Sequence, residues 1–397
     1  MTPASTPLAT LNAVTNTVSG LTVRCPEYQE DLQRPGGLIV LLDYGGSSIE
    51  ILDLRNGTRF PVSQEVNKKS LPAVSPSGRW LAYVEEDSQP EAAHLRIVNS
   101  DGISGVTAPW QTDWRNIAGW LDDEQLIISR SGIKTSDGLD TLVLLNPFTG
   151  MQQELPSNFP SIWTVTPKPQ WDGFSLAQTV YDPSLTYVVY ARYSEDLSGE
   201  ATAVGIWDVR ARQEVARLDG TNFFGRTPKW SALGLKLALA STLSTTMRGS
   251  ETIGTDQEIF VVSHKGQVVQ ATQLTTVYDV VKIGSLSWSP SGDYIAFWLE
   301  AEPRAYPEYW NSPDSSARQR LAVVDTSSAQ VTDYCVPGDK HSGLSADPVW
   351  SPDSQYVVTE NRINATTGRI FLTNISRGVT VQIAQDARPI GWMMPLP

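Results

Sequence analysis

The sequence predicts an all-β fold: a single closed β-propeller of seven four-stranded blades. Two observations predict it, a short phrase that recurs along the chain and a pair of alternating segments that follows the phrase. Clear copies of the phrase span residues 73–83, 287–297 and 349–359, and a worn copy spans residues 229–239. A phrase repeated at intervals of some tens of residues is typical of one supersecondary element that is stacked many times.

Each copy of the phrase is expected to form a tight hairpin. In the copy at 287–297, Pro290 presets φ for the second position of a type I turn, and Gly292 tolerates the positive φ that follows. The residues after the turn, 295–298, are apolar on both faces of a strand. That pattern is typical of a strand packed between two neighbouring sheets.

A second pair of strands follows the hairpin. The segments 94–103, 258–269 and 320–331 alternate in polarity around turn residues, two of them containing glycine. Alternation around such turns is a strong short-range signal of a β-hairpin. Four antiparallel strands per unit form one blade of a propeller.

The recurring phrase resembles the blade motif of the TolB-like, or WD40-like (PD40-type), β-propeller family. In that family a turn similar to Trp-Ser-Pro-Asp-Gly precedes an apolar strand, as it does at residues 287–297 and 349–359. Weaker copies at 119–128 and 179–190 extend the series. The resemblance implies a propeller, and the copies count its blades through seven turn positions: Pro76, Asp122, Pro183, Ala232, Pro290, Pro352 and Met394. Six blades are the alternative if one weaker copy is an insertion.

The two ends of the propeller are expected to share one blade. The last copy, 389–394, keeps only its first strand, and the N-terminal region from residue 37 to 60 supplies three strands without a first one. A C-terminal strand that completes the N-terminal sheet would remove the open edges of an unclosed array.

Residues 1–24 are predicted to form a flexible tether ahead of the propeller, which spans 25–397. The segment is rich in Thr, Ser, Pro and Ala and cannot bury enough apolar area to offset its ordering entropy. Such tethers are typical of segments behind a removed export signal or lipid anchor, which this sequence lacks. We therefore expect a bacterial protein of the periplasm or cell surface, tethered through its N-terminus; a ragged cytosolic N-terminus is the alternative.

The composition of the chain excludes some classes of binding partner. The net charge of −13 and the absence of a Lys/Arg run disfavour nucleic acid and anionic membrane surfaces. No stretch reaches the roughly 18 apolar residues of a membrane-spanning helix. The two cysteines, Cys25 and Cys335, either form one disulfide in an oxidising compartment or are two unrelated thiols.

The predicted binding surface lies on one of two rims. The turns within hairpins are short and define what we call the short-turn rim. The connections between second and third strands, and between blades, hold nearly all the loop length and define the long-loop rim. Long loops on a rigid scaffold concentrate binding residues, and aromatics with Arg are typical of interaction hot spots. The candidates are Arg304, Tyr306, Tyr309, Trp310, Trp163, Trp171, Trp110, Trp114, Phe223 and Phe224.

For each candidate tryptophan, ordinary core packing is the alternative. The tryptophans of the phrase itself are expected to pack between blades. These are Trp230, Trp288, Trp350 and Trp392.

The sequence carries no catalytic motif. It has no Gly-x-Ser-x-Gly elbow, no phosphate-binding glycine loop and no Ca²⁺ loop. His94 and His341 both fall on the long-loop rim, but they have no local metal-binding spacing. We expect no catalytic residues, no metal and no cofactor.

The leading functional hypothesis is a non-enzymatic, exported propeller that binds a protein or envelope component through the long-loop rim. One alternative is a polysaccharide lyase or glycosidase that works in the central channel. The other is a structural subunit of a surface assembly. Because unrelated functions share one fold, the phrase alone does not choose among them.

Overall fold

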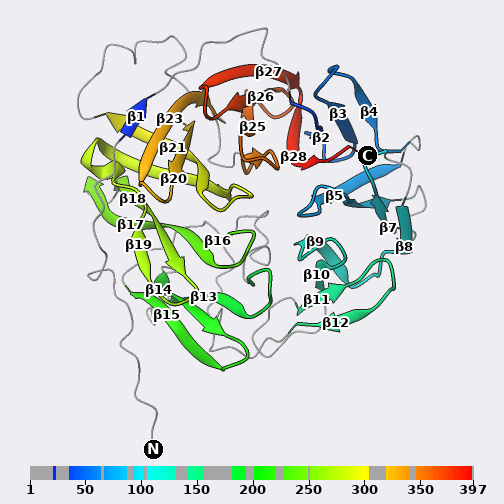
Figure 1. Cartoon of the computed structure of the whole chain (residues 1–397), viewed down its shortest axis with the longest axis horizontal. Coiled ribbons are helices and arrows are strands. Elements are labelled where there is room, and N and C mark those ends of the chain that lie inside the picture. The colour runs from blue at the N-terminus through cyan, green and yellow to red at the C-terminus, as the bar shows by residue number, and fades with distance from the viewer. Residues whose placement is uncertain are drawn as a thin grey trace, which may run out of the picture.

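The computed structural model describes residues 21–23, 35–63, 67–86, 93–101, 105–130, 141–155, 181–193, 201–219, 228–248, 251–303, 319–338 and 346–395. In this part of the chain the structure is nearly all β, and its strands form six hydrogen-bonded sheets. Figure 1 shows the sheets arranged around a common centre, with β5, β9, β16 and β28 nearest to it. The prediction of an all-β chain is confirmed.

The sheet that holds both ends of the propeller has the order β28-β2-β3-β4. Its strands are β2 (Leu38–Asp43), β3 (Ile49–Asp53), β4 (Arg59–Pro61) and β28 (Ala387–Met393). β28 runs antiparallel to β2, with Leu38 opposite Met393. The C-terminal strand therefore completes the N-terminal sheet, as the truncated last copy predicts.

Four further units follow the chain order of the recurring phrase. β5 (Lys68–Val74), β6 (Leu81–Glu86), β7 (Ala93–Val98) and β8 (Gly105–Pro109) form one sheet. The next sheet holds β9 (Trp114–Trp120), β10 (Leu126–Arg130), β11 (Thr141–Leu145) and β12 (Gln152–Glu154). A three-stranded sheet holds β13 (Tyr187–Tyr193), β14 (Ala201–Asp208) and β15 (Gln213–Asp219). The unit before β28 holds β24 (Val349–Trp350), β25 (Tyr356–Arg362), β26 (Gly368–Asn374) and β27 (Val379–Gln385).

The sixth sheet is nine-stranded and consists of two successive units joined at one point. The first unit is β16 (Lys229–Trp230), β17 (Lys236–Arg248), β18 (Glu251–Ser263) and β19 (Val268–Gln270). The second is β20 (Tyr278–Trp288), β21 (Tyr294–Pro303), β22 (Gln319–Asp325) and β23 (Gln330–Pro337). A single parallel pair, Asp256 with Val281, links the units. A 3-10 turn, Leu274–Thr276, connects them along the chain.

The ninth strand of this sheet is β1 (Leu21–Val23), at the end of the predicted tether. β1 pairs in parallel with β23, and Leu21 packs against the apolar cluster of that unit. Cys335, also in β23, is disulfide-bonded, and the sequence has one other cysteine, Cys25, which lies outside the described residues. Of the two alternatives for the cysteines, the structure shows the disulfide. The tether prediction for residues 1–20 falls outside the described residues.

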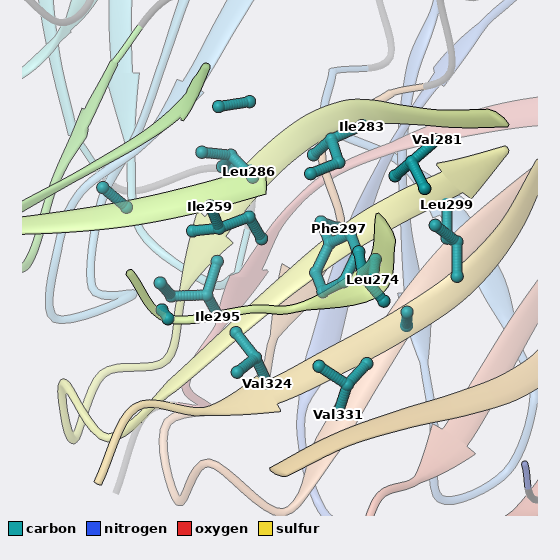
Figure 2. Close-up of a cluster of buried hydrophobic side chains, with 14 of the residues drawn as sticks. Ile259, Leu274, Val281, Ile283, Leu286, Ile295, Phe297, Leu299, Val324 and Val331 are labelled. Carbon is teal, nitrogen blue, oxygen red and sulfur yellow. The ribbon is translucent and has the colours of Figure 1, made fainter. Parts of the chain in front are cut away.

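The apolar core is divided into clusters that lie between neighbouring units. Along β6, Leu81 and Tyr83 face the unit of β2, whereas Ala82 and Val84 face the unit of β10. The second strand of the phrase is therefore buried on both faces, as its sequence predicts. Figure 2 shows the cluster between the two units of the nine-stranded sheet, in which Ile259 of β18 approaches Leu286 and Ile295.

Seven such clusters join the described units in cyclic order. They connect β2 with β6, β6 with β10, β11 with β13, β14 with β17, β18 with β21, β21 with β25, and β25 with β2. Every described unit thus buries apolar side chains against both of its neighbours.

Candidate functional site

The site begins with the turn of the recurring phrase, because the local sequence determines its backbone. In the β20–β21 turn, the Ser289 Oγ atom accepts a hydrogen bond from the backbone N–H of Tyr294 at 3.0 Å. The Ser289 N–H donates to the Tyr294 carbonyl in return, and Gly292 donates to the Ser289 carbonyl. Gly292 has a φ of 74°, which costs glycine little. Ser, Pro and Gly in this order therefore produce a closed turn.

The same arrangement recurs in three other copies. Ser75, Ser231 and Ser351 each accept a hydrogen bond from the backbone N–H five residues later. Asp182 takes this role in the weaker copy before β13. The turns are thus built alike at different points of the chain.

The tryptophans of the phrase tie the first strands of neighbouring units together. The indole N–H of Trp120 donates to the Ala73 carbonyl, that of Trp288 to the Lys229 carbonyl, and that of Trp350 to the Ser287 carbonyl, at 2.9 to 3.0 Å. In each pair the acceptor lies in the preceding unit.

All four tryptophans expected to pack between blades lie in the apolar clusters between units. Their predicted structural role is confirmed.

A cavity of about 880 Å³ lies where these turns and tryptophans meet, and we call it the mouth cavity. Four of the turn positions that count the units lie in its wall, together with three tryptophans of first strands. These are Pro76, Asp122, Pro183 and Ala232, with Trp120, Trp230 and Trp288. The cavity is therefore on the short-turn rim. Its size is within the range of ordinary ligand sites.

The charged residues of the mouth cavity are three carboxylates and one amine. Lys229 pairs with Asp347 at 2.8 Å between Nζ and Oδ2, although 118 residues separate them. Asp122 and Asp123 come from the β9–β10 turn. Burial acts to raise the pKa of Asp123, but hydrogen bonds from Ser77 and Ser75 and the charge of Arg79 outweigh it. The pKa of Asp123 therefore lies below its ordinary value, and the carboxylate is ionised at neutral pH.

Two exposed leucines lie in the turn that contributes Ala232 to the cavity wall. In the β16–β17 turn, Leu233 is 72% exposed and Leu235 is 49% exposed. Both residues follow Ala232, which lines the cavity. In the β20–β21 turn the equivalent positions hold serine and aspartate. The ring of Tyr187 stacks on Trp230, a residue of the cavity wall, with the ring centroids 6.4 Å apart.

The arrangement is suited to binding. It combines a rigid wall, aromatic carbon surface and fixed carboxylates, the usual components of a recognition site. Within the described residues no group of three His, Cys, Asp or Glu side chains is placed to hold a metal ion. In the same residues no helix is long and apolar enough to cross a membrane.

Two of the sequence-predicted binding residues lie in the described part of the chain, Trp110 and Trp114. Their rings contact edge to face with centroids 5.1 Å apart, and both belong to the apolar cluster between β6 and β10. This geometry matches the packing alternative for these two. The other candidates lie outside the described residues: Trp163, Trp171, Phe223, Phe224, Arg304, Tyr306, Tyr309 and Trp310. His341 lies outside them too.

Sequence reasoning did not identify the mouth cavity, because it treated the short-turn rim as structural. Two signals in the sequence point there. The turn positions of consecutive copies must meet around a common axis if the array closes. The worn copy also replaces polar turn residues with leucines at 233 and 235.

Comparisons with known proteins concern the fold. A scan of family models and a search of curated proteins both return no match. The crystal structure of TolB from Acinetobacter baumannii is 14% identical, with 92% of this chain and 68% of TolB covered, at a TM-score of 0.43. The periplasmic gluconolactonase PpgL of Pseudomonas aeruginosa is 15% identical, with 91% and 99% covered, at a TM-score of 0.50.

An oligogalacturonate lyase in complex with manganese is 12% identical, with 86% of this chain and 89% of the lyase covered, at a TM-score of 0.50. At identities this low the likeness to PpgL and to the lyase concerns the fold and not the activity. The chain has the β-propeller fold.

Proposed function

We propose that the chain is a closed, seven-bladed propeller that binds a protein or cell-envelope partner outside the cytoplasm, without catalysing a reaction. Seven blades are supported by the cyclic order of the seven apolar clusters, the last of which returns from β25 to β2. The pairing of β28 with β2 supports closure, because it joins the two ends of the array in one sheet.

The mouth cavity is the observation that carries the binding role. Two of its three tryptophans, Trp120 and Trp288, are held by hydrogen bonds to neighbouring first strands, so this part of the wall is pre-organised and little conformational entropy is lost when a ligand enters. The long-loop rim, with the residues around Arg304 and Trp310, is the second candidate surface.

A location outside the cytoplasm is supported by the disulfide of Cys335. Disulfides persist in the periplasm and at the cell surface, whereas cytosolic thiols are kept reduced. Cys335 lies in β23, the strand that pairs with β1.

Capture of partners tests the proposal. The full chain is immobilised and incubated with a cell-envelope fraction of the source organism, alongside two variants. One variant replaces residues 304–313 with Gly and Ser; the other is Leu233→Ser on the short-turn rim. Loss of a partner in one variant identifies the face that binds it. Absence of any partner specific to the folded chain would contradict the proposal.

An enzyme acting in the channel is the second candidate. Carboxylates and an amine meet in the mouth cavity, and two enzymes share the fold at a TM-score of 0.50. Turnover of pectic oligosaccharides or lactones, with and without Mn²⁺, would support this function if Asp347→Asn abolished it. A structural subunit of an assembly would instead show ordered oligomers in size-exclusion chromatography.

A further inference from the structure

The wall of the mouth cavity carries a net negative charge. Among the described residues it holds three carboxylates and one amine, a formal charge of −2. Lys229 is already paired with Asp347, which leaves Asp122 and Asp123 as the remaining carboxylates of the wall, and the charge of Arg79 acts on Asp123. The nearby Arg79 guanidinium lies over the Trp80 ring and outside the wall. The whole chain is acidic as well, at −13, so its field attracts cations.

Among the described residues, several hydrogen-bond donors of the wall are already engaged, and the Nε1 atom of Trp230 is buried without a partner. The indole N–H groups of Trp120 and Trp288 donate to strand carbonyls. The backbone N–H of Ser77 donates to Asp123. The indole N–H groups of Trp120 and Trp288 are therefore not available to an anion, whereas the face of an indole ring attracts an ammonium or guanidinium group. A ligand that donates hydrogen bonds and carries positive charge matches this wall.

The leucines beside the cavity add an apolar requirement. Single exposed apolar residues need no explanation. Leu233 and Leu235, however, stand in one turn, next to the cavity, where the equivalent β20–β21 turn is polar. A ligand that enters the cavity and also covers this turn needs a cationic part and an apolar part.

We propose that the mouth cavity binds a basic segment of a partner protein, with a Lys or Arg side chain between the tryptophans and the carboxylates and a neighbouring apolar side chain on Leu233 and Leu235. The proposal rests on the proposed binding function and specifies the chemistry of the partner. A peptide satisfies both requirements, since its backbone joins a basic and an apolar side chain at a fixed spacing. A free polyamine or a saccharide satisfies only one.

The test measures peptide binding by fluorescence anisotropy with the full chain. Three labelled peptides of equal length carry alternating Leu and Arg, alternating Ser and Arg, or alternating Leu and Glu. The Leu/Arg peptide is expected to bind most tightly, and added salt should weaken it. The Leu/Glu peptide is expected not to bind.

Two pairs of variants locate the site. Asp122→Asn removes a charge from the cavity wall. Its control, Glu124→Gln, removes the same charge from an exposed position of the same turn that is outside the wall. Leu233→Ser and Met151→Ser remove apolar residues that are both 72% exposed, on different turns. Asp122→Asn and Leu233→Ser should each raise Kd by about threefold or more, and the two controls should change it by less than about twofold. Unchanged thermal unfolding shows that all four variants are folded.

Several results would overturn the inference. These are equal binding of the Leu/Glu peptide, an equal loss in each control, or complete displacement of the Leu/Arg peptide by spermidine or a pectic oligosaccharide. If an envelope partner is captured but neither Asp122→Asn nor Leu233→Ser weakens it, the inference fails and the proposed binding function stands. If no partner is captured at all, the proposed function fails.

Discussion

The β16–β17 and β20–β21 turns have one backbone and two different surfaces. Ser231 and Ser289 each accept a hydrogen bond from the backbone N–H five residues on, at 3.3 and 3.0 Å. Gly234 and Gly292 have φ values of 66° and 74°. Yet Leu233 is 72% exposed where the second turn has a serine. The serine and the glycine maintain the turn, so the remaining positions can vary with function.

The largest expected effect comes from the glycine of a third copy of this turn. An alanine Cβ at Gly78 would lie 2.8 Å from the Trp392 carbonyl, whereas at Gly292 it would meet nothing within 4 Å. Both have a φ of 74°, so backbone strain costs about 1 kcal/mol in each. Gly78→Ala should lose about 3 kcal/mol or more and Gly292→Ala about 1 kcal/mol. Urea unfolding measures both, and equal losses would show that the turn behaves independently of the C-terminal strand.

The next largest effect on stability is expected to differ between Trp230 and Trp288, the tryptophans that precede the two turns. The Trp288 indole N–H donates to the Lys229 carbonyl, whereas the Trp230 Nε1 atom has no hydrogen-bond partner among the described residues. Trp288→Phe should therefore destabilise the protein by about 1 kcal/mol more than Trp230→Phe, because it leaves a carbonyl without its donor. Denaturant midpoints compare them. A larger loss in Trp230→Phe would contradict the bond's role.

A smaller effect is expected at the serines. Ser289 is fully buried, and its hydroxyl is the acceptor for a backbone N–H inside the turn. Ser289→Ala should cost about 1 kcal/mol. The equivalent bond of Ser231 is longer, at 3.3 Å, so Ser231→Ala should cost less. Thermal unfolding of the two variants shows which one loses more stability. A larger loss in Ser231→Ala would show that the distance between the serine oxygen and the backbone nitrogen does not determine the loss of stability.

The smallest effect is a pH dependence at the mouth cavity. The folded-state pKa of Asp123 is below its unfolded value near 3.8. Its stabilisation is complete above that value and is lost as pH falls through the lower folded pKa. Wild type should therefore lose slightly more stability than Asp123→Asn on acidification from pH 5 to pH 2. An equal loss of unfolding free energy in the two proteins between pH 5 and pH 2, measured by urea unfolding, would contradict this.

Much of the fold can be predicted from the sequence, because the informative interactions are local. The Ser-to-backbone bond spans five residues, so each copy of the phrase shows its own turn. The truncated copy at 389–394 likewise predicts the pairing of β28 with β2. The weaker copies at 119–128 and 179–190 predict the β9–β10 hairpin and the bridge of Tyr181 with Val188.

The candidate site was less predictable. The sequence directed attention to long loops, and most of the residues named there lie outside the described part of the chain. Trp110 and Trp114 show the difficulty, since the residue type indicates a binding hot spot whereas Trp114 is buried in the cluster between β6 and β10 and Trp110 is partly buried against it. Loop length and residue type do not report which side chains a neighbouring unit covers.

The sequence by itself determined the turns and the hairpins, since a handful of adjacent residues decides each, and its truncated last copy predicted the shared terminal sheet. Tertiary structure alone decided what surrounds them. Gly78 and Gly292 stand in the same Ser-Pro-Ser-Gly context, but only Gly78 packs against another strand. Lys229 in β16 and Asp347 before β24 meet at the mouth cavity, although the β20 unit stands between them in the chain, because the units surround a common centre. Contacts between distant copies depend on that packing, which no single copy encodes.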